Sequence, residues 1–268
     1  MNGSPWQDPE LYELENADDP HFDLPFWLEL VERRRPRRLL ELGCGTGRLT
    51  IPLAAAGAAA GDGFALVGLD TSEAFLARAR EGLARQPDHV RSAVRLETAD
   101  MRGFDLDERF DLVAVPFNTL AYLHTRDEQL ACLRAARAHL APDGAFSFDL
   151  LVPRVDFLAE ALHPFPAMRV DADIAAPAPG VERFVRACVD RYEPATQTLR
   201  STIFYDIHRD GGASERHVRD LAWHMYFPAE LEGLLDAAGL VALERHGGWR
   251  GEPLDGRARR YVFVCAAD

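Results

Sequence analysis

Residues 39–47 read LLELGCGTG, a short apolar run that contains one acid, Glu41, and ends in three glycines at alternate positions. The run has the length and composition of a buried strand, and a helical pattern begins near Arg48. Glycines at such a turn let the backbone bend sharply and let a ligand approach it closely. The stretch therefore predicts a strand, a ligand-binding turn and a helix, although many turns of this kind need glycine for steric reasons alone.

Similar units surround this one, from about residue 38 to residue 150. Short apolar runs alternate there with helical patterns, which is typical of a parallel sheet whose strands are connected by helices. Polar residues that can cap helices precede two of the helical patterns, at Thr71/Ser72 and at Thr125. We predict an open, doubly wound α/β sheet. Its expected strands are 39–42, 65–69, 94–97, 110–115 and 145–150.

The pattern changes after Leu150. Residues 152–180 contain five prolines and are expected to form loops, whereas 184–192, 198–208 and 216–227 have strand character and turns between them. They predict a small antiparallel β meander inserted into the α/β chain. A helix over 229–238 and strands over 240–244 and 261–265 would complete a Rossmann-like, seven-stranded sheet, mostly parallel with an antiparallel closing strand. The expected parts are an N-terminal lid segment (1–36), an α/β core (37–151), an inserted substrate cover (152–227) and a completion of the core (228–268).

Asp70 provides a second signal. It ends the next predicted strand, 23 residues after Gly47, where a carboxylate can accept the hydrogens of both ribose hydroxyls. The same two features fit a NAD-dependent oxidoreductase. A dinucleotide-binding turn has the spacing G-x-G-x-x-G, however, whereas the sixth position here is Arg48 and the third glycine comes one residue early. Glu41 is also foreign to the dinucleotide pattern, so the spacing disfavours that alternative.

This segment resembles motif I of the class I S-adenosylmethionine-dependent methyltransferases. The resemblance implies that Glu41 and the loop wrap the methionine and ribose part of S-adenosyl-L-methionine, and that Asp70, with Thr71 beside it, binds the ribose. The loop residues are Gly43, Cys44, Gly45, Thr46 and Gly47. A further alternative is a protein of the same fold that binds the cofactor but does not catalyse a reaction. The intact motif residues argue against this alternative.

The resemblance continues along the chain in the correct order to about residue 150. Asp100 and Met101 follow the third predicted strand, where the family binds adenine. Pro116, Phe117 and Asn118 form the tip of the fourth strand, where the family brings together the methionine end of the cofactor and the substrate. Residues 140–145 read LAPDGA and are similar to the turn that precedes the family's fifth strand. Together these segments imply an enzyme that uses S-adenosyl-L-methionine.

The N-terminal segment resembles the lid of small-molecule methyltransferases. Tyr12 and Trp27 are candidate aromatic contacts to the cofactor, since the face of an aromatic ring attracts a cation such as a sulfonium. The alternative is that 26–30 form a helix that packs on the core.

The charge balance bears on the methyl acceptor. The 268 residues include 30 arginines, no lysine and 43 acids, which gives a net charge of −13 and argues against nucleic acid and anionic membranes as partners. Residues 116–119 read PFNT and depart from the segment with which base methyltransferases stack a flipped base. We therefore expect a small molecule with an amine or a hydroxyl, methylated by direct in-line transfer.

Candidate residues on the acceptor side follow from these positions. His124 and His224 are candidate general bases. The candidate substrate contacts are Asn118, Tyr122, Trp223 and Tyr226. The four cysteines are dispersed, so we expect neither a metal site nor disulfides, and a cytoplasmic protein without a signal peptide or membrane span. We expect a homodimer if the meander leaves an apolar face exposed.

Overall fold

The computed structural model describes residues 8–17, 22–60 and 63–268. The chain divides into two compact units, one formed by residues 21–152 and 226–268 and the other by residues 1–20 and 153–225. Each unit contains one β-sheet. No helix among the described residues is both long enough and apolar enough to cross a membrane.

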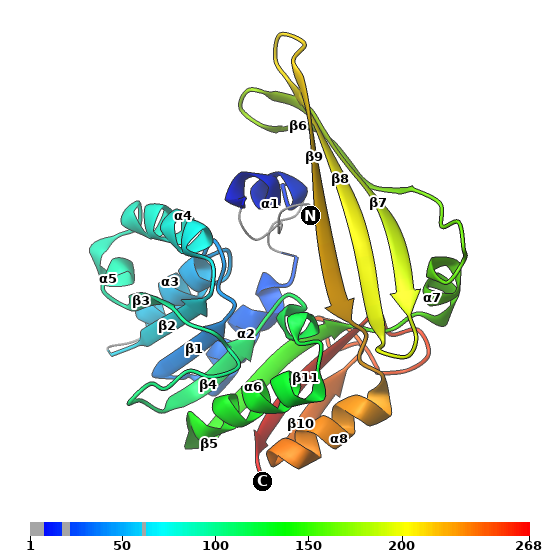
Figure 1. The fold of residues 1–268 in the computed structure, drawn as a ribbon. Helices are drawn as coiled ribbons and strands as arrows, with labels where there is room; N and C mark the ends of the chain where they lie inside the picture. The colour runs from blue at the N-terminus through cyan, green and yellow to red at the C-terminus, as the bar shows by residue number, and fades with distance from the viewer. Residues whose placement is uncertain (1–7, 18–21, 61–62) are drawn as a thin grey trace. The chain divides into compact units, whose positions relative to one another are not determined.

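The larger unit contains a seven-stranded sheet (Figure 1). Its strands are β1 (Arg38–Leu42), β2 (Ala65–Asp70), β3 (Val94–Thr98), β4 (Phe110–Val115), β5 (Leu140–Leu151), β10 (Leu240–His246) and β11 (Arg260–Ala267). The order across the sheet is β10-β11-β5-β4-β1-β2-β3. All pairs are parallel except those of β11 with its two neighbours, which are antiparallel. The predicted doubly wound sheet with an antiparallel closing strand is confirmed.

Helices cover both faces of this sheet (Figure 1). They are α2 (Leu24–Arg34), α3 (Thr50–Ala60), α4 (Glu73–Ala84), α5 (Asp88–Arg91), α6 (Arg126–Ala138) and α8 (Pro228–Ala238), with a 3₁₀ turn η2 (Thr119–Tyr122). On one face, α2 and α3 pack against side chains of β1, β2 and β4, and Leu39, Leu66 and Leu112 are fully buried there. On the other, α6 contacts α8. The sheet is thus buried on both sides, as a parallel sheet requires.

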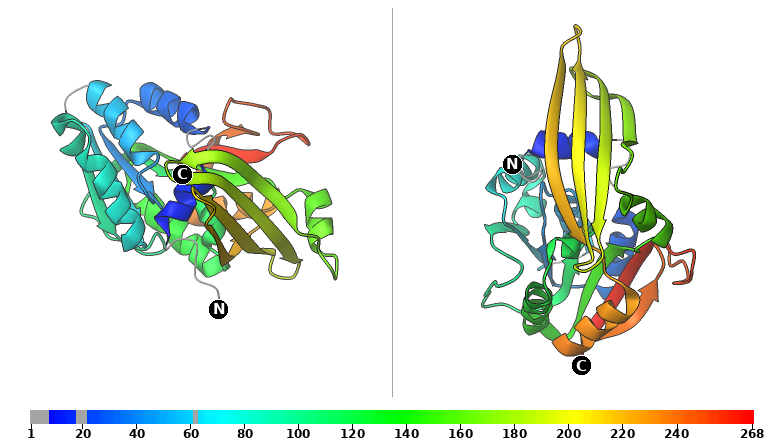
Figure 2. Two further views of the ribbon diagram at one scale, coloured as in Figure 1. Left: turned by 90° about the horizontal axis from the view of Figure 1, so that it is seen from above. Right: turned by 45° about the vertical axis from the view of Figure 1, so that its right-hand side comes forward.

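The smaller unit is a four-stranded antiparallel sheet in the order β6-β7-β8-β9 (Figure 2). Its strands are β6 (Arg169–Ala178), β7 (Val181–Glu193), β8 (Thr198–Arg209) and β9 (Ser214–His224), and its helices are α1 (Pro9–Glu15) and α7 (Val155–Ala161). Leu11 and Leu14 of α1 pack with Phe184, Ile203 and other apolar side chains of the sheet. This unit therefore has a small core of its own.

The meander differs from the prediction in one strand and one helix. Three strands were expected and four are present. Because of its prolines, the segment 152–180 was predicted to form loops, and both α7 and β6 were therefore missed. Strand β6 lies at the edge of its sheet, and Ile174 is its only buried residue. Pro177 lies within β6, which an edge strand tolerates because one side of its backbone needs no hydrogen bonds. An exposed edge strand lacks the alternation of apolar residues on which the sequence-based prediction relied.

Candidate active site

The glycine loop follows β1 and is hydrogen-bonded to the end of β2. The backbone N–H groups of Gly43 and Cys44 both donate to the carbonyl oxygen of Leu69, over 2.8 and 3.0 Å. Gly43 has a φ of +72°, and a Cβ on it would lie only 2.5 Å from Cγ2 of Thr119. Glycine is therefore required at position 43 by both its backbone conformation and the close approach of the segment that follows β4.

Asp70 is held against this loop. One carboxylate oxygen accepts the N–H of Gly45 over 2.9 Å, and the other accepts the N–H of Ser72 over 2.8 Å. Burial raises the pKa of Asp70, although hydrogen bonds from the backbones of Ser72, Gly45 and Thr71 act in the opposite direction. These three N–H groups use three of the roughly four acceptor sites of an ionised carboxylate. The carboxylate is thus fixed in position beside the loop and can still accept a hydroxyl hydrogen.

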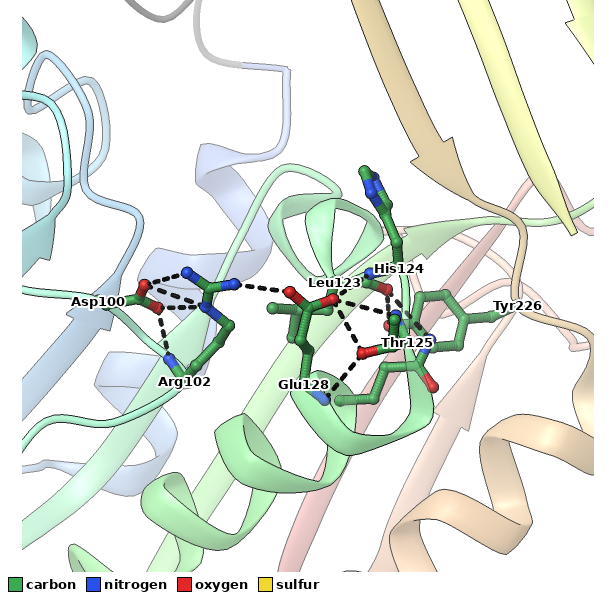
Figure 3. Close-up of polar contacts among 8 residues, drawn as sticks. Asp100, Arg102, Leu123, His124, Thr125, Glu128 and Tyr226 are labelled. Atoms are coloured by element: carbon green, nitrogen blue, oxygen red, sulfur yellow. Dashed lines mark hydrogen bonds and ion pairs between the residues drawn. The ribbon is translucent and has the colours of Figure 1, made fainter. Parts of the chain in front are cut away.

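Asp100 follows β3 and belongs to a chain of ion pairs (Figure 3). Its carboxylate contacts the guanidinium of Arg102 over 2.6 Å, and Arg102 also contacts Glu128 at the start of α6 over 2.6 Å. The hydrogen bonds from Arg102 hold the pKa of Asp100 below its usual range. Met101 lies next to it and is half-buried. Asp100 is therefore ionised, and Arg102 donates to both of its carboxylate oxygens.

The tip of β4 is fastened to β5. Phe117 and Asn118 have left-handed φ values of +59° and +63°, which are unfavourable for residues other than glycine. The N–H of Phe117 donates to Oδ1 of Asp149 over 2.6 Å, and Oδ1 of Asn118 accepts the N–H of Leu151 over 2.8 Å. These bonds hold an uncommon backbone conformation at the point where β1 and β4 diverge, which is where doubly wound sheets bind ligands.

Two buried ion pairs lie beneath this tip, and sequence reasoning missed both. Arg48 contacts Asp23 over 2.6 Å, and Arg260 contacts Asp149 over 2.7 Å. The Arg48 guanidinium also lies 4.6 Å from the centre of the Phe117 ring. The signal in the sequence is an acid inside an apolar run, as in FSFDLL (146–151). Such an acid needs a buried partner, but the sequence alone does not identify that partner.

Glu41 is enclosed at the end of β1. Its carboxylate accepts the hydroxyl of Thr50 over 2.6 Å. Burial raises the pKa of Glu41 to about 7, and the Thr50 hydrogen bond and Arg48 oppose this effect. Its side chain is only 2% exposed and connects β1 to the start of α3. Its contact to the cofactor stays a prediction.

The remaining predicted residues of the larger unit lie in different surroundings. Trp27 is 1% exposed and packs edge-to-face on Phe26, which favours the alternative that this segment packs on the core. The buried Tyr226 hydroxyl donates to the carbonyl oxygen of Leu120 over 3.0 Å. His124 is exposed, and its ring points away from the ion-pair chain of Asp100 (Figure 3). Tyr122 is half-buried in η2. The roles of these residues stay predictions.

Three predicted residues belong to the smaller unit. Tyr12 lies on α1 and is half-buried. Trp223 and His224 end β9, where they pair with Leu199 and Thr198 of β8, and His224 is buried. Their contacts to a cofactor or an acceptor stay predictions. Within the described ranges, no group of three or more His, Cys, Asp or Glu side chains could hold a metal ion.

Comparison with known proteins agrees with this geometry. A methyltransferase-domain family model matches residues 40–146, which run from β1 into β5 and contain the loop, Asp70, Asp100 and the β4 tip. The chain is also similar to the solved structure of the CcbJ methyltransferase from Streptomyces caelestis, with a TM-score of 0.74 and 27% identity over 93% of this chain and 96% of the other. The resemblance to class I methyltransferases is confirmed.

Two curated relatives extend this comparison. The dTDP-3-amino-3,6-dideoxy-alpha-D-glucopyranose N,N-dimethyltransferase of Streptomyces fradiae is 36% identical over 141 residues, which cover 50% of this chain and 49% of the relative. The dTDP-3-amino-3,4,6-trideoxy-alpha-D-glucopyranose N,N-dimethyltransferase of Streptomyces venezuelae is 28% identical over 91% of this chain and 98% of the relative. The chain thus spans about half the length of the first relative and nearly all of the second.

Proposed function

Since this chain has the fold of a class I S-adenosylmethionine-dependent methyltransferase, we propose that it transfers a methyl group from S-adenosyl-L-methionine to an amine of a small molecule. The observation that carries the proposal is the contact of 2.9 Å between the Gly45 N–H and the Asp70 carboxylate. It joins the glycine loop and the ribose-binding acid of the family motif beside the position where β1 and β4 diverge.

In this proposal, the residues at the strand ends bind different parts of the cofactor. The loop from Gly43 to Gly47 would accommodate the methionine part of the cofactor, and Asp70 would accept the ribose hydroxyls. Asp100 would accept the amine of adenine. The cofactor supplies a methyl carbon already activated by a positive sulfur, so the protein needs no covalent nucleophile. Its work is to align the acceptor, to exclude water and to hold the developing charge.

The acceptor class is inferred from two independent features. Two relatives are named for N,N-dimethylation of amino sugars, which supports a small amine. The net charge of −13 disfavours a nucleic acid. His124 or His224 would remove the proton from a protonated amine, and an amine that is already neutral would need no base. A hydroxyl acceptor is the second candidate.

Calorimetric titration with S-adenosylhomocysteine tests the cofactor assignment. We expect the wild-type protein to bind it, and we expect Asp70→Asn to weaken binding by about tenfold, because one ribose hydroxyl loses a charged acceptor. Asp88→Asn, which changes an exposed acid on α5, is the matched control and should bind like the wild type. Binding of NAD in place of S-adenosylhomocysteine would establish the oxidoreductase alternative instead.

A transfer assay tests the acceptor. Methyl transfer from labelled S-adenosyl-L-methionine is measured with amino sugars, with the corresponding hydroxyl sugars and with RNA. Transfer to amino sugars alone is the expected result, and transfer to RNA would contradict the proposed acceptor class.

Location and assembly are further inferences. The four cysteines are buried thiols in the structure, which supports a cytoplasmic location. A homodimer would use an exposed apolar surface such as Val241 and Leu243 on the edge strand β10. Light scattering of the purified protein gives its mass in solution and decides between a monomer and a dimer.

A further inference from the structure

A pocket of about 480 Å³ lies beside the candidate active site, within the larger unit. It is formed by the end of β5 at Leu151 and by the loop that joins β10 to β11. Arg260, the first residue of β11, pairs with Leu151, so the pocket opens at the same edge of the sheet as the glycine loop and the β4 tip. Asn118 accepts the N–H of Leu151 and thereby connects this tip to the pocket wall.

The loop that forms the pocket is tightly built. The N–H of Gly247 donates to the carbonyl oxygen of Glu252 over 2.7 Å, and the N–H of Arg259 donates back to Gly247 over 3.2 Å. A Cβ on Gly247 would lie 2.3 Å from the carbonyl oxygen of Pro253, so only glycine fits there. The backbone conformation of this loop is therefore well defined, and it determines the shape of the pocket.

The polar groups of this pocket are mainly unused donors. Among the residues that the structure describes, the exposed guanidinium groups of Arg257 and Arg259 make no ion pair, and the buried Nε1–H of Trp249 has no acceptor. The two acids of the lining, Glu252 and Asp255, already accept backbone N–H groups, those of Arg250 and Arg257. Of the three arginines in the lining, only Arg260 is paired, with Asp149.

Guanidinium groups that make no ion pair select an acceptor of hydrogen bonds that is negatively charged. Guanidinium groups bind phosphate and carboxylate oxygens in pairs of parallel hydrogen bonds, and an indole N–H can only donate. We propose that this pocket, lined by Trp249, Arg257 and Arg259, holds an oxyanion group of the methyl acceptor, either a phosphate ester or a carboxylate. The inference rests on the proposed function, and it specifies a chemical group that the methyl acceptor carries.

The position of the pocket assigns it to the acceptor and not to the cofactor. The residues proposed for the cofactor follow β1, β2 and β3, whereas the pocket lies at β5 and β11, on the opposite side of β4. The β4 tip thus separates the two. An acceptor anchored by its oxyanion at β5 and β11 would extend its amine toward Asn118, where the methyl group is delivered.

Calorimetry with two small anions tests the pocket directly. Inorganic pyrophosphate and malonate are titrated into the full-length protein at constant ionic strength. We expect saturable binding of one of them, and the tighter of the two identifies a phosphate or a carboxylate as the natural group. Arg257→Gln and Arg259→Gln should each weaken this binding by about tenfold, and Trp249→Phe should weaken it by about threefold.

Arg250→Gln is the matched control, because Arg250 lies in the same loop and carries the same charge but does not line the pocket. It should leave anion binding unchanged. Binding of neither anion, or an equal loss in Arg250→Gln, would overturn the inference. Titration with S-adenosylhomocysteine separates the two proposals: if the cofactor product binds and the anions do not, only the pocket assignment fails. Anion binding with the expected variant pattern, but no binding of S-adenosylhomocysteine, would overturn the proposed function alone.

Discussion

Asp149→Asn should destabilise the protein far more than its single atom of change suggests. Asp149 is fully buried, contacts Arg260 over 2.7 Å and accepts the N–H of Phe117 over 2.6 Å. Asparagine retains the size and an oxygen for Phe117, but it leaves the Arg260 side chain, which is 13% exposed, without its counter-charge. Breaking a buried ion pair in this way costs about 3 to 5 kcal/mol. That is a large part of a total stability of about 5 to 15 kcal/mol.

Burial raises the pKa of Asp149 in spite of Arg260 and lowers the pKa of Arg260 in spite of Asp149. Desolvation therefore outweighs attraction for both partners. It follows that removing both charges together should cost less than removing one, and Asp149→Asn with Arg260→Met should recover about half of the loss or more.

Urea unfolding followed by tryptophan fluorescence measures these free energies. Glu81→Gln removes one partner of the exposed pair of Arg78 and Glu81 and serves as the control, with no change expected beyond experimental error. A loss below about 1 kcal/mol for Asp149→Asn would refute the reasoning, since exposed pairs have that magnitude. So would a double variant that is less stable than the single one.

Three further predictions concern the glycine loop and its surroundings. Gly43→Ala should lower stability by about 1 to 3 kcal/mol and weaken S-adenosylhomocysteine binding, because its Cβ would lie 2.5 Å from Thr119 at a φ of +72°; urea unfolding and calorimetry measure both. Tyr226→Phe should cost about 1 kcal/mol in urea unfolding, because its buried hydroxyl donates to the carbonyl oxygen of Leu120. Stability should fall as the pH rises from about 5 to 7, by about 1 kcal/mol per pH unit from Glu41, because its pKa of about 7 means that the folded state holds a proton which the unfolded state has lost. Glu41→Gln should remove this part of the slope in urea unfolding at several pH values, and an unchanged slope would contradict the assignment.

The core of the fold could be predicted because its signals are local. The runs 39–42 and 110–115 are buried strands, apart from the half-buried Asp111, and Ser72 and Thr125 cap their helices as expected. Strand β6 was not predicted because Ile174 is its only buried residue and it contains Pro177, so its sequence carries little apolar alternation. Burial, turn geometry and caps are properties of neighbouring residues, whereas edge position depends on the whole sheet.

For the candidate site, the residues at strand ends could be predicted from the sequence, but the buried ion pairs could not. Residues 43–47, Asp70 and Asp100 lie at strand ends, and a strand end can be located from the strand itself. The ion pair of Asp149 with Arg260 joins residues 111 positions apart. No spacing rule connects them, because their contact exists only after β5 and β11 have paired.

The place of β11 between β5 and β10 has a consequence for biosynthesis. The ribosome completes β5 at Leu151 and reaches β11 only at Arg260, after the whole smaller unit has been made. At about 5 to 20 residues per second, the edge of β5 waits roughly 5 to 20 s for its partner. During that time the apolar strand with Phe146 and Phe148 offers unpaired backbone groups to other nascent chains. A chaperone that binds extended apolar segments would be most useful to this protein in that interval, and the length of the insertion sets how long the interval lasts.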